Sequence, residues 1–280
     1  MDTFAFAIHR VCMKQYRILF EDAKRGSPMT NRLKEKLKAG EPAFGVSVMF
    51  PSPQIVEMVG KLGFDWVMID CEHGSVSPES IETMAMAAEL NGITPIARPW
   101  TNSAEAILRV MDRGAMGVQV PHVNTADDAK RAVEAVKYYP QGERGLAAGS
   151  RPANYGFGLP MSEYVVQANA DTLVCVQLEE QEALRNIDEI LKVEGVDVFF
   201  VGPSDLSQSM GYPGKSGEPV VKQAMDDAFA KIVAADKAPG SAGNAQATNG
   251  YLSQGVQYLY THLTTLLGSA SSDFLGSVKR

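Results

Sequence analysis

Two acidic residues each follow a short apolar segment of the sequence. Glu179 comes directly after 172–178 (TLVCVQL), and Asp205 follows 196–201 (VDVFFV) through a Gly-Pro-Ser turn. On adjacent parallel strands, about 5 Å apart, two such carboxylates would repel strongly unless a cation neutralised them. Carboxylate oxygens suit hard divalent ions such as Mg²⁺ or Mn²⁺. The pair therefore predicts a metal site with Glu179 and Asp205 as ligands; the alternative is that each acid only caps a helix or pairs locally.

Two further apolar segments end in groups that could act on a substrate. The segment 66–69 leads into Asp70-Cys71-Glu72-His73, and 94–97 leads into Arg98. An imidazole titrating near neutrality is the usual general base, and a guanidinium suits the negative charge of an enolate or alkoxide. We therefore predict catalytic roles for His73 and Arg98. The alternatives are a structural histidine and a salt bridge from Arg98 to a nearby acid.

Two more features are candidates for the same site. Asp112 stands at the end of the helix predicted after Arg98 and could orient His73, although spacing alone does not establish that pair. In the turn 202–205, Gly202 would let the backbone approach a ligand, and Ser204 or Asp205 could cap the next short helix. Exposed amides at such a helix start bind carboxylates, whereas the alternative is an ordinary turn.

The elements that must position these groups alternate regularly along the chain. Strand-like segments are predicted at 43–50, 66–70, 94–98, 117–120, 172–178, 196–201, 238–243 and 256–261. Helical spacing is predicted at 52–62, from about 77, and at 102–111, 127–136, 181–193 and 219–236. The pattern predicts an α/β fold, a (β/α)8 TIM barrel whose active site gathers at the carboxyl ends of the strands. A doubly wound sheet is the structural alternative, but no GxGxxG motif follows the first strand.

The pattern also predicts the domain organisation. Residues 29–280 are predicted to form one barrel domain. Residues 1–28 are predicted to be an N-terminal extension of unknown role, either a stretch that precedes the natural start or an appended helix. Its acidic residues disfavour a targeting peptide. The Gly-rich stretch 141–158 is long for a connection, so we expect either a lid over the site or a subunit contact.

Composition limits the classes of partner. The net charge of −7 argues against a nucleic-acid surface, and no apolar run approaches the length of a membrane span. The three cysteines are widely spaced, as in the reduced thiols of an intracellular, cytoplasmic protein. None of the predicted strands contains lysine, so a Schiff-base mechanism is disfavoured relative to metal chemistry.

Several separated motifs carry a resemblance to a known family. FDWVMIDCEHG (64–74), PIARP (95–99), Gln177-Leu178-Glu179 and FVGPSDLS (200–207) occur in that order. The chain from about residue 31 to its end resembles the HpcH/HpaI family of class II, metal-dependent pyruvate aldolases. Members of this family cleave 4-hydroxy-2-oxoheptanedioate or 2-keto-3-deoxy sugar acids, and the fold is a (β/α)8 barrel.

The resemblance also implies roles for single residues. Glu179 and Asp205 match the ligands of the divalent metal (Mg²⁺, Mn²⁺ or Co²⁺), and His73 matches a base that acts through a metal-linked water. Asp112 matches the partner of that histidine, and Arg98 matches the arginine that stabilises the transition state. Residues that match positions holding the 2-oxo acid are Gln177, Gly202, Ser204 and Asp205.

The implied reaction is the reversible cleavage of a 4-hydroxy-2-oxo acid to pyruvate and an aldehyde through a metal-bound pyruvate enolate. The family is usually a hexamer, a trimer of dimers that exchange the last helix. Two other readings stay open. An oxaloacetate decarboxylase or a macrophomate-synthase-like enzyme would use the same enolate, and a non-enzymatic ligand-binding barrel would need none of these residues.

Overall fold

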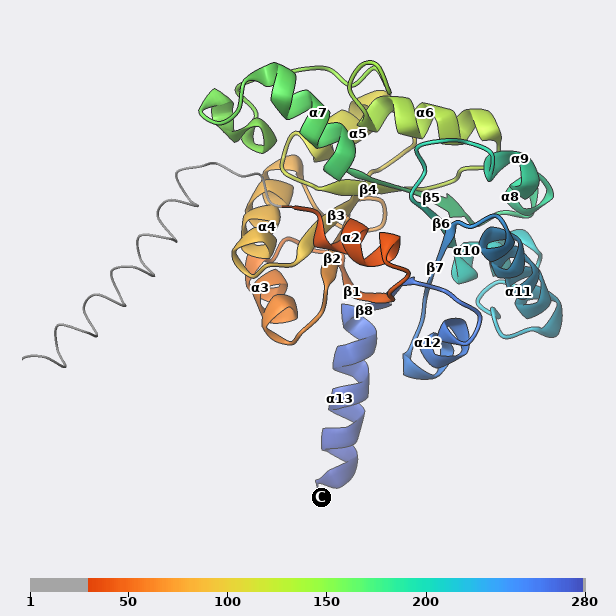
Figure 1. The fold of residues 1–280 in the computed structure, drawn as a ribbon. Coiled ribbons are helices and arrows are strands. Elements are labelled where there is room, and N and C mark those ends of the chain that lie inside the picture. Colours follow the sequence, from red (N-terminus) through yellow and green to blue (C-terminus); the bar gives the residue numbers. More distant parts are fainter. Residues whose placement is uncertain (1–29, 279–280) are drawn as a thin grey trace, which may run out of the picture.

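A closed barrel of parallel strands forms the centre of the protein (Figure 1). The computed structural model describes residues 30–278, so the predicted extension at 1–28 lies outside the described residues. The strands follow one another around the barrel in sequence order, and β8 pairs with β1. They are β1 (Ala43–Val48), β2 (Trp66–Asp70), β3 (Thr94–Arg98), β4 (Gly117–Val120), β5 (Leu173–Leu178), β6 (Val198–Val201), β7 (Ala238–Ala242) and β8 (Tyr258–His262). This confirms the predicted (β/α)8 barrel and rules out the doubly wound sheet.

The helices surround the barrel, and most of them lie where helical spacing predicts them. They are α2 (Arg32–Lys38), α3 (Pro53–Lys61), α4 (Pro78–Leu90), α5 (Ala104–Met111), α6 (Ala126–Val136), α7 (Met161–Asp171), α8 (Gln181–Arg185), α9 (Ile187–Ile190), α10 (Pro203–Ser209), α11 (Pro219–Ala234), α12 (Ala245–Leu252) and α13 (Leu263–Ser277), with a 3-10 turn η1 (Arg151–Gly156). The single helix predicted at 181–193 is wrong. It breaks at Asn186, whose backbone leaves the helical region and whose side-chain amide donates to Asn124 O at 2.9 Å.

Large side chains fill the interior of the barrel. Trp66, Ile96, Phe200 and Tyr258 pack there, and the rings of Trp66 and Tyr258 lie 4.2 Å apart. Gly45 makes room for this packing, since a Cβ atom at that position would lie 2.3 Å from the Trp66 ring. The outward side chains of the strands are mostly valine, and they form a second apolar layer against the helices. The barrel is therefore a packed core whose two ends carry the polar groups.

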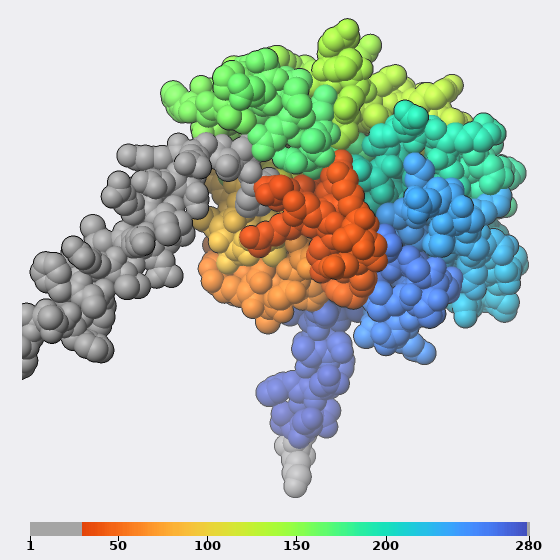
Figure 2. Space-filling model, viewed as in Figure 1, coloured from red at the N-terminus to blue at the C-terminus, as the bar shows by residue number. Residues whose placement is uncertain are grey.

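Helix α2 closes the amino end of the barrel. It lies across the centre of the view in Figures 1 and 2, and its Leu33 and Leu37 join the interior core. Beside it, Lys34 Nζ donates to Thr172 O at 2.8 Å and lies 3.0 Å from Asp197 Oδ1. Lys137 Nζ donates to Asn169 O, Thr172 O and Thr172 Oγ1 at 2.9, 2.7 and 2.9 Å. This end of the barrel is sealed by an internally satisfied polar network.

Helix α13 differs from the other helices because it leaves the body of the protein. It projects away from the barrel in Figures 1 and 2, and only Leu263 at its start is buried. Its exposed apolar side chains include Leu267, Phe274 and Leu275. Within residues 30–278, neither this helix nor any other combines the length and apolar character that a membrane crossing requires.

Candidate active site

The polar groups predicted from strand ends meet at the carboxyl end of the barrel, which we call the mouth. Arg98 is the last residue of β3, Glu179 follows β5, and Gly202 follows β6. Parallel strands point in one direction, so residues that follow different strands share one edge of the sheet. The fold therefore brings together Arg98, Gln177, Glu179 and the 202–205 turn, although they are far apart in the sequence.

Arg98 is buried and held by two acids of the β2 end. Its Nε donates to Asp70 Oδ1 at 2.9 Å, and its Nη2 donates to Asp70 Oδ2. Glu72 Oε2 lies 3.3 Å from the same Nε. Asp70 also accepts the backbone N–H groups of Glu72 and His73 at 3.1 and 3.3 Å, which fixes the loop after β2. The salt bridge considered as an alternative therefore exists, and Arg98 Nη1 still faces Gln177 Oε1 at 3.4 Å.

Gln177 connects this cation to the first predicted metal ligand. Its Oε1 accepts from Gln119 Nε2, and its Nε2 donates to Glu179 Oε2. Gln119 in turn accepts the hydroxyl of Tyr258 from inside the barrel at 3.0 Å. The amide of Gln177 is thus fixed in orientation by a chain of buried donors and acceptors. It delivers an N–H to one oxygen of Glu179.

Glu179 is a buried carboxylate in an acidic environment. Its pKa is raised to about 7, chiefly by burial and also by the charges of Asp205 and Glu72, against the hydrogen bond from His122 N and the charge of His122. His122 Nδ1 lies 3.4 Å from Glu179 Oε1, and His122 Nε2 lies 3.2 Å from Glu72 Oε1. Burial lowers the pKa of His122, but the nearby carboxylates raise it by more, so the His122 pKa lies above its ordinary value. Acidic charge is therefore in excess at the mouth.

The residues of β6 and α10 leave space beside Glu179. Gly202 caps α10, and a Cβ atom there would lie 3.1 Å from Glu179 Oε2. Asp205 is in the first turn of α10 and is half-buried, whereas Ser204 is exposed. The predicted capping by Ser204 or Asp205 is wrong, because neither side chain caps the helix. The glycine instead leaves room beside Glu179, and Asp205 is near enough for its charge to act on that carboxylate. Two neighbouring carboxylates with free space beside them fit a small hard cation.

The donor set would be completed from outside the protein. Within residues 30–278 no three His, Cys, Asp or Glu side chains are grouped as ready metal ligands. A cation held by Glu179 and Asp205 would therefore take its other ligands from water and substrate, as Mg²⁺ commonly does. This is the coordination that a substrate-binding metal needs.

His73 and Asp112 are not brought together within one chain. His73 is half-exposed at the mouth, and its Nε2 lies 3.6 Å from Glu72 Oε2. Asp112 ends α5, where Arg144 Nη2 donates to its Oδ1 at 2.8 Å. Helix α5 runs back from the mouth, so its last residue lies at the amino end of the barrel. The predicted pair is therefore not formed in this chain, and the carboxylate beside His73 is Glu72.

Sequence reasoning missed three side chains of the mouth. Asp70 and Glu72 stand in the motif that contains His73, but only the histidine was assigned a role. His122 follows β4 directly after Pro121, which is the position from which the other strands supply their polar groups. That position was the signal that could have identified it. Cys71, from the same motif, is buried, and burial raises the pKa of its thiol to about 12.

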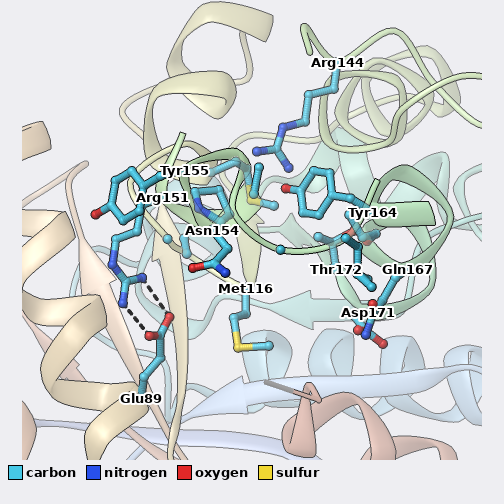
Figure 3. Close-up of a pocket in the computed structure, with 18 residues that line it drawn as sticks. Glu89, Met116, Arg144, Arg151, Asn154, Tyr155, Tyr164, Gln167, Asp171 and Thr172 are labelled. Atoms are coloured by element: carbon cyan, nitrogen blue, oxygen red, sulfur yellow. Dashed lines mark hydrogen bonds and ion pairs between the residues drawn. The ribbon is translucent and has the colours of Figure 1, made fainter. Parts of the chain in front are cut away.

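A separate pocket lies on the flank of the barrel near its amino end (Figure 3). It measures about 390 Å³, and its lining includes Glu89, Arg144, Arg151, Tyr155 and Tyr164. Arg151 donates through both terminal nitrogens to the carboxylate of Glu89, so these charges are paired with each other. None of the predicted site residues lines this pocket. The loop 141–158 contributes to it and not to the mouth.

Comparisons with known proteins identify relatives of this chain. A hydroxypyruvate/pyruvate aldolase of Sagittula stellata is 39% identical over 202 residues, which cover 72% of this chain and 79% of that protein. A 4-hydroxy-2-oxo-heptane-1,7-dioate aldolase of Shigella flexneri is 37% identical over 245 residues, covering 87% and 91%. The crystal structure of a family protein from Burkholderia cenocepacia superposes with a TM-score of 0.82 at 28% identity, covering 88% of this chain and 99% of that one.

The family model for HpcH/HpaI aldolase/citrate lyase matches residues 45–258, from the first strand of the barrel to the last. The matched region contains every residue described at the mouth. The chain belongs to the HpcH/HpaI aldolase/citrate lyase family.

Proposed function

We propose that this protein is a metal-dependent pyruvate aldolase, a lyase that reversibly cleaves 4-hydroxy-2-oxo acids to pyruvate and an aldehyde. The observation that carries the proposal is the buried Glu179 beside Asp205 and Glu72, an excess of acidic charge that faces Arg98 across Gln177. Relatives that share more than a third of their aligned residues with this chain are named as aldolases of this kind.

Glu179 and Asp205 would hold a divalent cation such as Mg²⁺, Mn²⁺ or Co²⁺. The bound ion would supply a Lewis acid for the 2-oxo group and a counter-charge for the enolate. The protein's part is to hold the two carboxylates in place. Gln177 Nε2 and His122 N fix Glu179, and Gly202 keeps the space beside it free.

The remaining groups would act on the substrate. Gln177 and Ser204 would bind the 2-oxo acid, and Arg98 would stabilise negative charge on the oxygen at the reacting centre. His73 would take the proton from the C4 hydroxyl. Glu72 is the acid beside His73 within one chain, so we assign the orientation of the imidazole to Glu72. The role predicted for Asp112 stays a prediction, because Asp112 does not lie beside His73 within one chain.

We also propose that the enzyme is a homo-oligomer that uses α13 as a contact. An isolated helix of this length is marginal in water unless its apolar face is packed. Leu267, Phe274 and Leu275 of α13 are all exposed, and so are Tyr155 and Phe157 of the loop 141–158. A hexamer with an exchanged last helix, as the family resemblance implies, would cover such side chains. Light scattering on a Leu267→Asp variant would show a smaller particle than the wild type if α13 is a contact.

The activity test is the release of pyruvate from racemic 4-hydroxy-2-oxo acids of different chain lengths. The reaction is run with EDTA and then with added Mg²⁺, Mn²⁺ or Co²⁺, and hydroxypyruvate is tried as a second donor with several aldehydes. Metal-dependent pyruvate release supports the proposal, and the best chain length identifies the substrate class. Rapid turnover of oxaloacetate with no aldol cleavage would favour the decarboxylase reading instead.

A further inference from the structure

His122 has a backbone conformation that its residue type seldom adopts. Its φ is +53°, in the left-handed region, where a Cβ atom crowds the following carbonyl oxygen. Asn154, Tyr155 and Asp236 are the other non-glycine residues with positive φ in the part of the chain that the structure describes. Such a conformation persists only where the surroundings determine it, and it often marks a functional site. His122 is the member of this group that lies at the mouth.

The left-handed turn directs the main chain of His122 at a predicted metal ligand. The N–H of His122 donates to Glu179 Oε1 at 2.8 Å, and the next N–H, of Val123, donates to Gln177 O at 3.1 Å. The other oxygen of Glu179 accepts from Gln177 Nε2. Each oxygen of this buried carboxylate thus has one fixed donor. The arrangement sets which side of the carboxylate faces Gly202.

The imidazole of His122 is more exposed than its main chain, although its Nδ1 also lies 3.4 Å from Glu179 Oε1. The side chain is 55% exposed, and its Nδ1 lies 3.0 Å from Glu180 Oε1 at the rim of the mouth. Its Nε2 lies 3.2 Å from Glu72 Oε1. The main-chain N–H, in contrast, serves a carboxylate that is 2% exposed. A hydrogen bond to a buried charged group is the stronger of the two kinds of contact.

We propose that His122 is a positioning residue of the metal site and that it acts through its main chain. The left-handed turn after β4 places the N–H that holds Glu179 in the orientation needed to bind a divalent cation. The imidazole is not required for this role. The inference rests on the proposed function, since it concerns the cation that Glu179 and Asp205 would share.

Substitutions at position 122 separate the main chain from the side chain. His122→Gly removes the imidazole and favours the left-handed conformation, and His122→Asn tolerates it. His122→Ala disfavours this conformation, and His122→Val disfavours it more strongly because valine is β-branched. The readout is the dissociation constant of Mn²⁺, measured on EDTA-treated protein by the electron paramagnetic resonance of free Mn²⁺.

We expect the glycine and asparagine variants to bind Mn²⁺ within about threefold of the wild type, or more tightly. The valine variant should bind about 10- to 100-fold more weakly, which is typical of losing a contact to a metal ligand, and the alanine variant should fall between. If His122→Val does not fold, the alanine variant carries the comparison. If the glycine variant binds Mn²⁺ as weakly as the valine variant, the role belongs to the imidazole. If the valine variant binds Mn²⁺ as tightly as the wild type, His122 has no role in positioning Glu179.

Asp236→Val is the matched control. Asp236 has a φ of +56° and lies after α11, in an exposed turn that precedes β7. The same backbone change there should lower the melting temperature and leave the Mn²⁺ affinity unchanged. An equal loss of affinity in this control would mean that the effect at 122 is general strain. A wild type that binds no Mn²⁺ would overturn the proposed function together with this inference, whereas a wild type that binds it while the series shows no order would overturn the inference alone.

Discussion

The two ends of the barrel both bury charged side chains, but they treat them in opposite ways. At the amino end, Lys137 Nζ has three acceptors within 2.9 Å, and Lys34 is paired with Asp197. At the mouth, Glu179 is buried near the carboxylates of Asp205 and Glu72, whose like charges act against its own. Glu72 Oε2 has no hydrogen-bond donor among the described residues, although Arg98 Nε is 3.3 Å away.

This difference distinguishes a structural network from a site. A polar network whose members all have partners stabilises one packing arrangement and needs nothing from outside. A buried cluster with excess negative charge is costly until a positive group enters it. We therefore interpret the amino end as the fixed base of the fold and the mouth as the place where a cation and a substrate complete the structure.

Removing a predicted metal ligand should have the largest effect. Asp205→Asn keeps the size of the side chain but lowers its affinity for a hard cation, so pyruvate release should fall on the order of 1000-fold or more. Steady-state kinetics at a fixed Mn²⁺ concentration that just saturates the wild type would measure this. Glu180→Gln is the control, because Glu180 is at the rim and contacts His122 only through its imidazole. A control that loses as much activity as Asp205→Asn would contradict the assignment of the ligand.

Substituting Arg98 should have the second-largest effect. We expect kcat to fall roughly 100- to 1000-fold, as when a donor to a developing oxyanion is removed. The variant must be Arg98→Lys. The alanine variant would leave Asp70 buried at 0% exposure without its cation, and removing one partner of such a pair costs about 3–5 kcal/mol. A lysine variant that keeps both the melting temperature and the kcat of the wild type would contradict the catalytic role of Arg98.

The acidic mouth also predicts a pH dependence of stability in metal-free protein. The pKa of Glu179 is raised from 4.5 to about 7, so the folded state binds more protons than the unfolded state between these values. The contribution of Glu179 to the free energy of unfolding should therefore be fully present below about pH 4.5. It should be lost as the pH rises through 7, a decline of roughly 3 kcal/mol. Denaturant titrations from pH 5 to 8 would show this decline in the wild type and a weaker one in Glu179→Gln. Equal slopes in the two proteins would contradict it.

At the amino end, a buried lysine should make the free energy of unfolding change with pH in the opposite direction above neutrality. Burial, together with the charge of Lys34, lowers the pKa of Lys137 from 10.5 to about 7. Between these values the unfolded lysine binds more protons, so stability should rise with pH in that window and be lost as pH falls through 7. In Lys137→Met this rise should be weaker, and the unfolding free energy should drop by about 1–3 kcal/mol because the acceptors lose their donor. The same variant should keep kcat/KM within about twofold, and a large loss of activity would show that the two ends are not independent.

Sequence reasoning reached the barrel and the main groups of the mouth because both depend on one simple pattern. Each strand is a compact apolar run, and Arg98, Glu179 and Gly202 stand immediately at its end, so chain order alone places them together. It did not reach His122, because nothing in the sequence reveals a left-handed turn at a histidine. The partnership of Asp112 with His73, which the family resemblance implies, stays a prediction, because the direction of α5 places that aspartate at the other end of the barrel within one chain. Contacts between loops of different strands, such as Glu72 with His122, depend on side-chain orientations that spacing does not determine.

The most direct test of the account is the position of the metal itself. Crystals grown with Mn²⁺ and examined by anomalous scattering at the manganese edge should show one strong peak per chain, between the carboxylates of Glu179 and Asp205 and beside Gly202. The peak should be absent in Asp205→Asn crystals treated in the same way. No peak at the mouth of the wild type, or a peak that ignores the Asp205 substitution, would contradict the claim that the acidic excess at this end of the barrel exists to hold a cation.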